Sequence, residues 1–400
     1  MRPFRMIGTR FFNSCFALQR NATFREPEPM SEFPHAMLRE IFEQPEAMRR
    51  TLALYAGGQS LNAEAFAPLD QWLNPRGEVL IAASGSSRHA GLAAEILLED
   101  LCGLSVDVEY ASEWGCRGTA NPRHPSVLVI SQSGETSDTL AALRQARDRG
   151  ERTLAIANVP GSAMLREAGA AMVLAAGREL AIPATKSFTC QLTALYLLAI
   201  YLGRQTGAMD SAEADRNLRE LQAMPAQIES QLEGWRNATA ALAKAYADAS
   251  TFLYLGRGIH YAIAREGALK MKESSYVHAE GYPAGELKHG PNALVGEDVP
   301  LVVLATADRG LEDSMLRYEK TLQLLEDMKK QGARVIALAN AGDAQVAAQA
   351  THMIEIEPAG EYLLPIAEVI PLQFFSYFMA LEHGIDVDRP RNLSKAVIEQ

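Results

Sequence analysis

The chain has 400 residues, enough for two domains of ordinary size, and its 48% hydrophobic and 22% charged residues are typical of a globular protein. A net charge of −11 argues against a nucleic-acid-binding surface, which would be basic and clustered, but it allows a local cationic pocket. No apolar run reaches the roughly 18 residues of a membrane span, and the longest, residues 192–203, has the length of a core helix. We therefore expect a cytoplasmic protein that binds neither nucleic acid nor a membrane.

The N-terminus is unusual because five arginines and no acidic residue precede Glu26. This composition resembles that of an organellar transit peptide. The alternative, which we favour, is that translation starts at Met30 and that residues 1–29 are untranslated or form a disordered leader. Both interpretations place residues 1–29 outside the fold.

The four cysteines are too few and too scattered for a disulfide framework, and none has the CxxC spacing of a thiolate zinc site. We expect them to be reduced thiols: Cys15, Cys102, Cys116 and Cys190. No metal and no cofactor are expected.

The rest of the chain contains an internal repeat. Residues 78–97 read as a strand, a polar glycine turn and an amphipathic helix, and residues 251–273 read the same way. The apolar segments 152–158 and 334–340 are also alike, as RTLAIAN and RVIALAN. Continuous apolar strands that alternate with helices predict parallel sheets covered on both faces, so we expect two α/β domains related by internal duplication. The expected parts are an N-terminal helix at 30–44, a first domain at 45–205, a helical connector at 206–224, a second domain at 225–385 and a catalytic tail at 386–400.

The first domain contains a turn that is rich in hydroxyl groups. The apolar strand 127–130 is followed by Ser131, Gln132, Ser133 and Thr136, and a helix is expected to begin near Thr136. Free N–H groups and the dipole at a helix start attract anions, and the carboxyl edge of an open α/β sheet is where ligands bind. A phosphate monoester suits this turn, although a helix cap with surplus polar residues would look the same.

Ser86 and Ser87 follow the preceding strand and are placed to contact the same phosphate or a sugar hydroxyl. Ordinary turn chemistry explains them equally well. Neither turn matches a dinucleotide fingerprint or a Walker loop.

Residues 266–291 carry the densest group of titratable side chains. Glu266, Lys270 and Glu273 are spaced to share one face of a helix, and His289 follows sixteen residues after Glu273. No zinc motif fits, whereas carboxylate, histidine and lysine together suit proton transfer and imine chemistry. On spacing alone, catalysis and a solvated charged face are equally good interpretations.

Lys395 is a single lysine in the C-terminal tail, with small or apolar neighbours. A lysine that loses some solvation deprotonates more easily, as a Schiff-base nucleophile requires. Without other information, an ordinary surface lysine is the better interpretation.

Three segments closely resemble the sugar isomerase half of glucosamine-6-phosphate synthases and its stand-alone relatives. They are SQSGETSDTL at 131–140, EGALKMKESSYVHAEGYPAGELKHGP at 266–291 and DVDRPRNLSKAV at 386–397, and the resemblance covers nearly all of residues 35–400. It implies two sugar isomerase (SIS) domains, each a flavodoxin-like five-stranded parallel sheet flanked by helices. It also implies a hexose 6-phosphate substrate and a homodimer with a shared active site.

The resemblance implies a role for each matching residue. Glu273 would move a proton between C1 and C2 of the sugar, Lys395 would attack the C2 carbonyl, and Lys270 would assist near the open-chain sugar. His289 would open the ring in the active site of the neighbouring subunit. The implied phosphate and sugar contacts are Ser86, Ser87, Ser131, Gln132, Ser133, Thr136, Ile182 and Ala184, with Arg391 steadying the tail.

Two features depart from the synthase pattern. Fewer than 45 residues precede the SIS core, so we expect no glutaminase domain in this chain. The segment IPATKSF at 182–188 has Pro183 and Ala184 where a serine-bearing loop is expected, which would change one contact to the sugar.

These departures lead to three hypotheses for function. The main one is a glucosamine-6-phosphate deaminase that releases ammonia and fructose 6-phosphate, because water is in large excess over free ammonia. The alternative is amination of fructose 6-phosphate, with ammonia that is free or comes from a separate glutaminase. The third is a non-catalytic sugar-phosphate sensor, although this chain shows no basic recognition helix of the kind that such regulators often carry.

Overall fold

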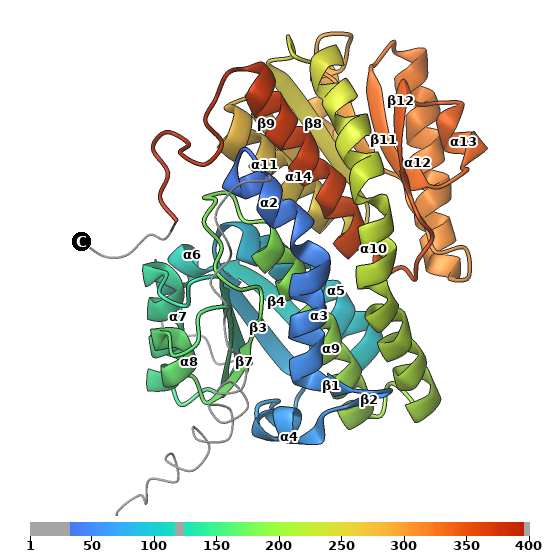
Figure 1. Cartoon of the computed structure of the whole chain (residues 1–400). Helices are drawn as coiled ribbons and strands as arrows, with labels where there is room; N and C mark the ends of the chain where they lie inside the picture. Colours follow the sequence, from blue (N-terminus) through green and yellow to red (C-terminus); the bar gives the residue numbers. More distant parts are fainter. Residues whose placement is uncertain (1–32, 117–123, 396–400) are drawn as a thin grey trace, which may run out of the picture.

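The computed structural model describes residues 33–116 and 124–395, and the predicted leader lies outside them. Each half of this part contains one five-stranded parallel sheet with helices on both faces (Figure 1). The predicted fold class and the internal duplication are therefore confirmed.

The first sheet has the strand order β4-β3-β5-β6-β7, and all of its strands are parallel. Its strands are β3 (Glu78–Ala83), β4 (Ser105–Tyr110), β5 (Ser126–Ser131), β6 (Thr153–Ala157) and β7 (Ala170–Val173). Its helices are α5 (Gly85–Cys102), α6 (Ala111–Cys116), α7 (Ser137–Asp148), α8 (Ala163–Glu167) and α9 (Lys186–Thr206). β4 lies on one side of β3, and β5 and the later strands lie on the other, so the strand order reverses between β3 and β5. Ligands of open α/β sheets bind at this switch point.

The second sheet repeats this order as β9-β8-β10-β11-β12, again with parallel strands. Its strands are β8 (Thr251–Gly256), β9 (His278–Pro283), β10 (Leu301–Leu304), β11 (Val335–Asn340) and β12 (His352–Ile356). Its helices are α11 (Ile259–Ser275), α12 (Glu312–Lys330), α13 (Ala344–Ala347) and α14 (Leu364–Glu382), with the short 3-10 helices η2 (Ala284–His289) and η3 (Pro291–Leu294). The repeated segments 152–158 and 334–340 supply β6 and β11, at the same place in each sheet.

One hydrophobic core joins the two halves. Alternate residues of β5 face opposite ways: Leu128 and Ile130 belong to the central core, and Val127 and Val129 belong to a smaller cluster under α6, α7 and α8. The central core also contains residues of α9, α11 and α14. Within this core, α11 of the second half packs against α5 of the first half.

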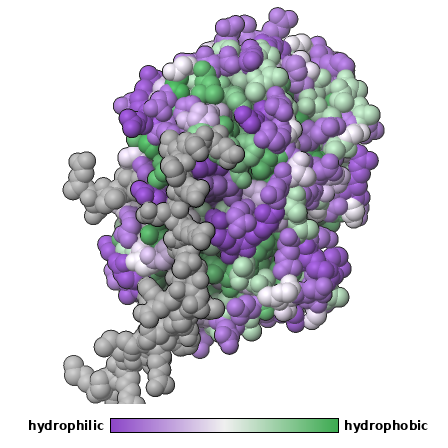
Figure 2. Space-filling view, in the orientation of Figure 1, coloured by the Kyte–Doolittle hydropathy of each residue, from purple (hydrophilic) through white to green (hydrophobic). Residues whose placement is uncertain are grey.

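α14 is the one helix of the described residues with the length and hydropathy of a membrane span, and 89% of its most apolar window is buried in the protein. It packs in the central core, as α9 does, and both are therefore core helices of the protein. The surface seen in Figure 2 is largely hydrophilic, with smaller apolar areas between.

The N-terminal segment forms α2 (Ala36–Phe42) and α3 (Gln44–Tyr55), where one helix over residues 30–44 was expected. Pro45 lies in the first turn of α3, a position that proline favours because its missing N–H has no helical partner there. After α3 come β1 (Ala56–Gly57), β2 (Ser60–Leu61), α4 (Ala63–Phe66) and the 3-10 helix η1 (Ala67–Leu69).

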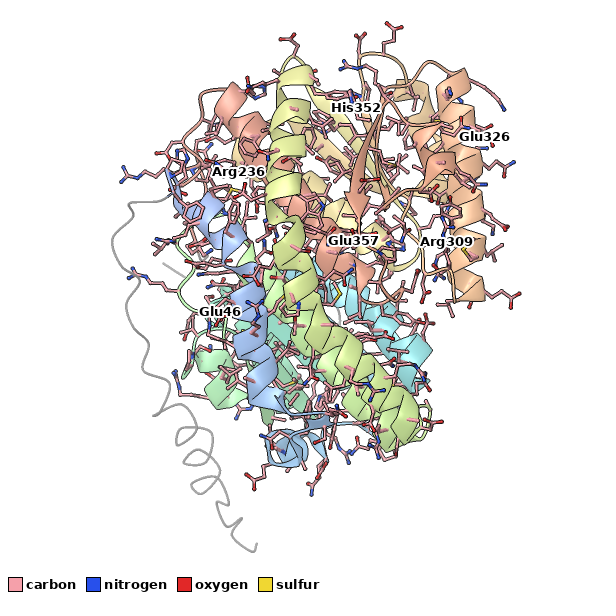
Figure 3. All side chains as sticks on the ribbon, turned by 45° about the vertical axis from the view of Figure 1, so that its right-hand side comes forward. Glu46, Arg236, Arg309, Glu326, His352 and Glu357 are labelled. Atoms are coloured by element: carbon pink, nitrogen blue, oxygen red, sulfur yellow. The ribbon has the colours of Figure 1, made fainter. Side chains whose placement is uncertain are left out.

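A single 35-residue helix, α10 (Ser211–Ala245), connects the halves and continues past the expected boundary at residue 224. Asp210 caps its start by accepting a hydrogen bond from the backbone N–H of Glu213. Figure 3 shows α10 running along both halves, with Arg236 in its second part and Glu46 on neighbouring α3.

Candidate active site

The predicted site residues converge on one cavity of about 170 Å³ at the carboxyl edge of the first sheet. Its walls come from the start of α5, the turn between β5 and α7, the loop after β7, α11 and the C-terminal tail. The predicted residues that line it are Ser86, Ser87, Ser131, Gln132, Ser133, Thr136, Ile182, Ala184, Glu273 and Lys395. Lys270 lies directly behind this wall, and His289 and Arg391 lie elsewhere.

The turn after β5 holds its hydroxyl groups close together. Ser131 Oγ is 3.0 Å from Thr136 Oγ1 and accepts a hydrogen bond of 3.0 Å from the backbone N–H of Gly134. Thr136 is the N-cap of α7, and its side chain does not cap the helix. The N–H groups of the first turn of α7 therefore have no side-chain cap and are available to an anion.

Gly134 is required by the shape of this turn. Its φ is +68°, a left-handed conformation that residues with a Cβ rarely adopt. A Cβ built there would overlap the side chain of Ser162, with only 2.6 Å between the two Cβ atoms. The turn can therefore close against the start of α8 only with glycine at this position.

The start of α5 supplies a second helix N-terminus to the same cavity. Ser84 is its N-cap, also without a side-chain capping bond, and Gly85 has a φ of +55°. Ser87 Oγ accepts a hydrogen bond of 3.0 Å from Gln191 Nε2 of α9. Two helix N-termini with small hydroxyl side chains thus face one cavity, an arrangement that suits a phosphate.

α11 brings a buried ion cluster to the opposite wall. Lys270 is fully buried, and its Nζ lies 2.5 Å from Glu273 Oε2 and 3.3 Å from Glu266 Oε1. It also donates a hydrogen bond of 3.1 Å to Ser86 Oγ. The expectation that Lys270 and Glu273 share a helix face agrees with this geometry, and Lys270 holds Glu273 beside the cavity.

The electrostatics of this cluster follow from burial and pairing. Burial alone would lower the pKa of Lys270, but Glu266 and Glu273 outweigh it and raise that pKa. Burial opposes ionisation of Glu266, yet Lys270 and a 2.7 Å contact with His89 Nδ1 lower its pKa. Burial in turn lowers the pKa of His89. The two carboxylates therefore favour the charged form of Lys270.

The C-terminal tail brings Lys395 to the cavity. In Figure 1 the tail leaves the end of α14 and descends toward the first half. Lys395 Nζ donates a hydrogen bond of 2.8 Å to Glu179 Oε2 and another to the backbone carbonyl of Ala181. The lysine therefore has a buried carboxylate as partner and is not a free surface side chain.

The loop between β7 and α9 carries this carboxylate. Glu179 is buried and accepts hydrogen bonds from the backbone N–H groups of Thr185 and Ser187 and from Ser187 Oγ. Burial raises its pKa, but the charge of Lys395 and these hydrogen bonds outweigh that and lower it. Ile182 and Ala184 of the same loop line the cavity, so the methyl group of Ala184 stands where a serine hydroxyl was expected.

A second buried carboxylate supports this loop from α2. Glu40 accepts hydrogen bonds from the backbone N–H groups of Leu180 and Ala181. Burial and the nearby charge of Glu179 raise its pKa to about 7. On the first turn of α9, Lys186 forms an ion pair with Glu43.

His289 and Arg391 lie outside the cavity. His289 is exposed at the end of η2, so its suggested role in a neighbouring subunit stays a prediction. The guanidinium of Arg391 stacks over the Tyr276 ring at 4.3 Å, and its backbone N–H donates to Tyr276 Oη. This contact joins the tail to the end of α11 four residues before Lys395, and the role of Arg391 in steadying the tail stays a prediction.

Sequence reasoning missed Glu179 and Glu40. Each is one acidic residue among many, and only the fold shows that both are buried beside the loop that holds Lys395. The cavity is also lined by residues that were not predicted: Ser84, Ile130, Thr139, Leu393 and Ser394. Proximity to the predicted residues in sequence was the one signal that pointed to these five.

Comparisons with known proteins identify the family of this fold. A family model described as SIS domain matches residues 73–201 and 245–383, one copy in each half. The chain belongs to the SIS-domain family. The solved C-terminal domain of glucosamine-fructose-6-phosphate aminotransferase from Francisella tularensis is 32% identical, with a TM-score of 0.83. The match covers 91% of this SIS protein and all of that domain.

The curated relatives are also aminotransferases that act on fructose 6-phosphate by name. Glutamine–fructose-6-phosphate aminotransferases (isomerizing) from Thermus thermophilus and Chlorobaculum tepidum are 42% and 43% identical over 91% of this chain. The chain spans only about three fifths of the length of these relatives, 59% and 58% respectively. The solved glucosamine-6-phosphate deaminase from Thermotoga maritima is 20% identical with a TM-score of 0.66, so its likeness shows the fold alone.

Proposed function

We propose that this SIS protein aminates and isomerises fructose 6-phosphate to glucosamine 6-phosphate. The observation that carries the proposal is one cavity that combines two hydroxyl-rich helix N-termini with Glu273 and Lys395. The two helix N-termini suit a phosphate, whereas Glu273 and Lys395 suit proton transfer at carbon and imine formation. Family membership and the names of the relatives identify the chain as an enzyme and speak against a sensor without activity.

The direction of the reaction differs from our main expectation. The sequence led us to favour deamination, but the relatives above 30% identity are named as aminotransferases. The deaminase match supports only the fold. We therefore place amination first, with deamination as the same chemistry in reverse.

The proposed chemistry assigns one task to each group. The turn after β5 and the start of α5 bind the phosphate, and Lys395 attacks the C2 carbonyl of the open-chain ketose. Formation of the lysine imine releases the C2 oxygen as water. Ammonia then replaces the lysine at C2. Glu273 takes a proton from C1 and returns it to C2, which leaves an amine at C2 and an aldehyde at C1.

Lys270 suits these reaction steps because its positive charge lies against Glu273 and Ser86. There it holds the carboxylate in place during proton transfer and stabilises negative charge that develops on the enol intermediate. Ring opening by His289 of a second copy of the chain completes the proposal.

The test is to incubate the purified protein with fructose 6-phosphate and either ammonium or glutamine, and to measure glucosamine 6-phosphate. Product from ammonium supports the proposal, and product from glutamine with a separate glutaminase would identify the nitrogen source. A parallel assay measures ammonia release from glucosamine 6-phosphate. Release without detectable amination at high ammonium would return deamination to first place, and no conversion in either direction would refute both.

A further inference from the structure

The amine of Lys395 is bound to a carboxylate that no solvent reaches. Lys395 Nζ lies 2.8 Å from Glu179 Oε2, and the Glu179 side chain has no exposed surface. Glu179 is held by its other contacts: Oε1 accepts the N–H groups of Thr185 and Ser187, and Oε2 accepts Ser187 Oγ. The lysine side chain, by contrast, is 27% exposed.

The proposed function requires a neutral amine on Lys395. A lysine side chain in water is an ammonium ion at neutral pH. An ammonium ion has no lone pair and cannot attack a carbonyl carbon. Lys395 must therefore lose a proton inside the cavity before it can react.

The charged groups around Lys395 leave one good acceptor for that proton. Glu273 of α11 also lines the cavity, but it is paired with Lys270. The two carboxylate oxygens of Glu40 on α2 already accept hydrogen bonds from the N–H groups of Leu180 and Ala181. Lys186 of α9 is a cation paired with Glu43. Among the described residues, Glu179 is the one carboxylate that accepts a hydrogen bond from Lys395 Nζ.

We propose that Glu179 is the proton acceptor and donor for Lys395 during imine formation, an inference that rests on the function proposed above. Glu179 takes one proton from the ammonium along their hydrogen bond. The neutral amine then forms the bond from nitrogen to C2 as the C2 carbonyl π-bond breaks toward oxygen. A second proton passes from nitrogen to this oxygen, and Glu179 returns the first proton to it.

The step then balances. The C2–O bond breaks, the oxygen leaves with both protons as water, and nitrogen keeps one proton in the protonated imine. The products are an iminium ion, water and the Glu179 carboxylate, so the net charge is unchanged. The iminium keeps the ion pair with Glu179 that the ammonium had, and the reaction neither creates nor removes a buried charge.

The structure offers a selective variant. In Glu179→Gln, the amide oxygen can keep the bonds to Thr185 and Ser187 N–H, and the amide nitrogen can donate to Ser187 Oγ. Only the carboxylate charge and the bond to Lys395 are lost. The matched control is Glu43→Gln, which makes the same chemical change beside Lys186 of the same segment and has no described contact with Lys395.

The experiment mixes the full chain with fructose 6-phosphate and sodium borohydride, without ammonium, and follows the mass gain of the peptide that carries Lys395. Trapping is measured from pH 6 to 9 at saturating sugar, with sugar binding measured by calorimetry. We expect Glu179→Gln to bind fructose 6-phosphate but to be trapped about 100-fold more slowly or worse, with its pH profile moved to lower pH. Glu43→Gln should follow the wild type, and Glu179→Asp should recover part of the rate.

Three outcomes would overturn the inference. Trapping of Glu179→Gln at the wild-type rate would show that no proton passes through the carboxylate, even if the pH profile moves. Loss of sugar binding would assign Glu179 to the substrate instead. If Glu179→Gln does not fold, the test uses Glu179→Asp. A folded Glu179→Asp that is trapped more slowly but keeps the wild-type pH profile would indicate a structural role. A wild-type protein that is never trapped would refute the Schiff base of the proposed function and, with it, the role of Glu179, whereas normal trapping of Glu179→Gln overturns the role of Glu179 alone.

Discussion

Replacing Lys270 by methionine tests the buried ion cluster of α11. The ammonium is fully buried between Glu266 and Glu273, at 3.3 and 2.5 Å. Methionine has a similar length but no charge, so Glu266 would stay buried with His89 and Ser86 as its remaining partners. Removing one partner of a buried ion pair costs about 3–5 kcal/mol, a large part of the roughly 5–15 kcal/mol that keeps a protein folded.

The expected change in melting temperature follows from this free energy. At about 2–4 °C per kcal/mol for domains of this size, Lys270→Met should melt on the order of 6–20 °C below the wild type. The loss should be smaller at pH 5 than at pH 8. In the variant the pKa of Glu266 rises above its unfolded value, so the folded state binds a proton, and the penalty grows as the pH rises past the unfolded value.

The assay is thermal unfolding at both pH values, with Lys272→Met as the control because Lys272 is exposed on the same helix. The double variant Lys270→Met/Glu266→Gln should regain part of the stability, since it removes the unpaired charge, but not the enzymatic activity. A single variant that melts within about 2 °C of the wild type at pH 8 would refute this reasoning.

Three further predictions concern the phosphate turn and the second half. Ser131→Ala should raise the KM for fructose 6-phosphate about tenfold or more, since a hydrogen bond to a charged group is worth about 1.5–3 kcal/mol; an unchanged KM would place the phosphate elsewhere. Gly134→Ala should lower both stability and phosphate affinity, because of the positive φ and the overlap with Ser162, and wild-type melting would contradict this. His260 lies 2.8 Å from Glu368 and 3.4 Å from Glu361; burial opposes its charge, but these carboxylates raise its pKa to about 10. The stabilising contribution of His260 is therefore full below about pH 6.5 and is lost as the pH rises to about 10. The free energy of unfolding should fall over this pH window in the wild type and fall less steeply in His260→Asn.

The hydroxyl-rich turn could be predicted because all of its signals are local. An apolar strand, a run of small donors and a helix start lie within about ten residues, and this order alone places N–H groups and hydroxyls at a sheet edge. The structure has β5 ending at Ser131 and Thr136 at the N-cap position of α7, as the pattern predicted. Lys270 and Glu273 were predictable for the same reason, since helical spacing sets which side chains share a face.

The partner of Lys395 could not be predicted in this way. Glu179 is separated from Lys395 by more than half of the chain, and the spacing of acidic residues carries no sign of burial. Glu40 lies in α2, outside both segments that match the family, yet it supports the loop that holds Lys395. Both carboxylates become special only because the packing around α9 removes them from water.

The amino-acid sequence by itself determined the two α/β halves, their parallel sheets and the anion-binding turn. Hydrophobic periodicity and strand-end chemistry act over a few residues, so they can be read without knowing what lies nearby in space. The tertiary structure decided that a helix of the second half and residues 393–395 of the tail meet that turn in one cavity. It also decided which charges are buried there, because burial depends on contacts between segments that are distant in sequence.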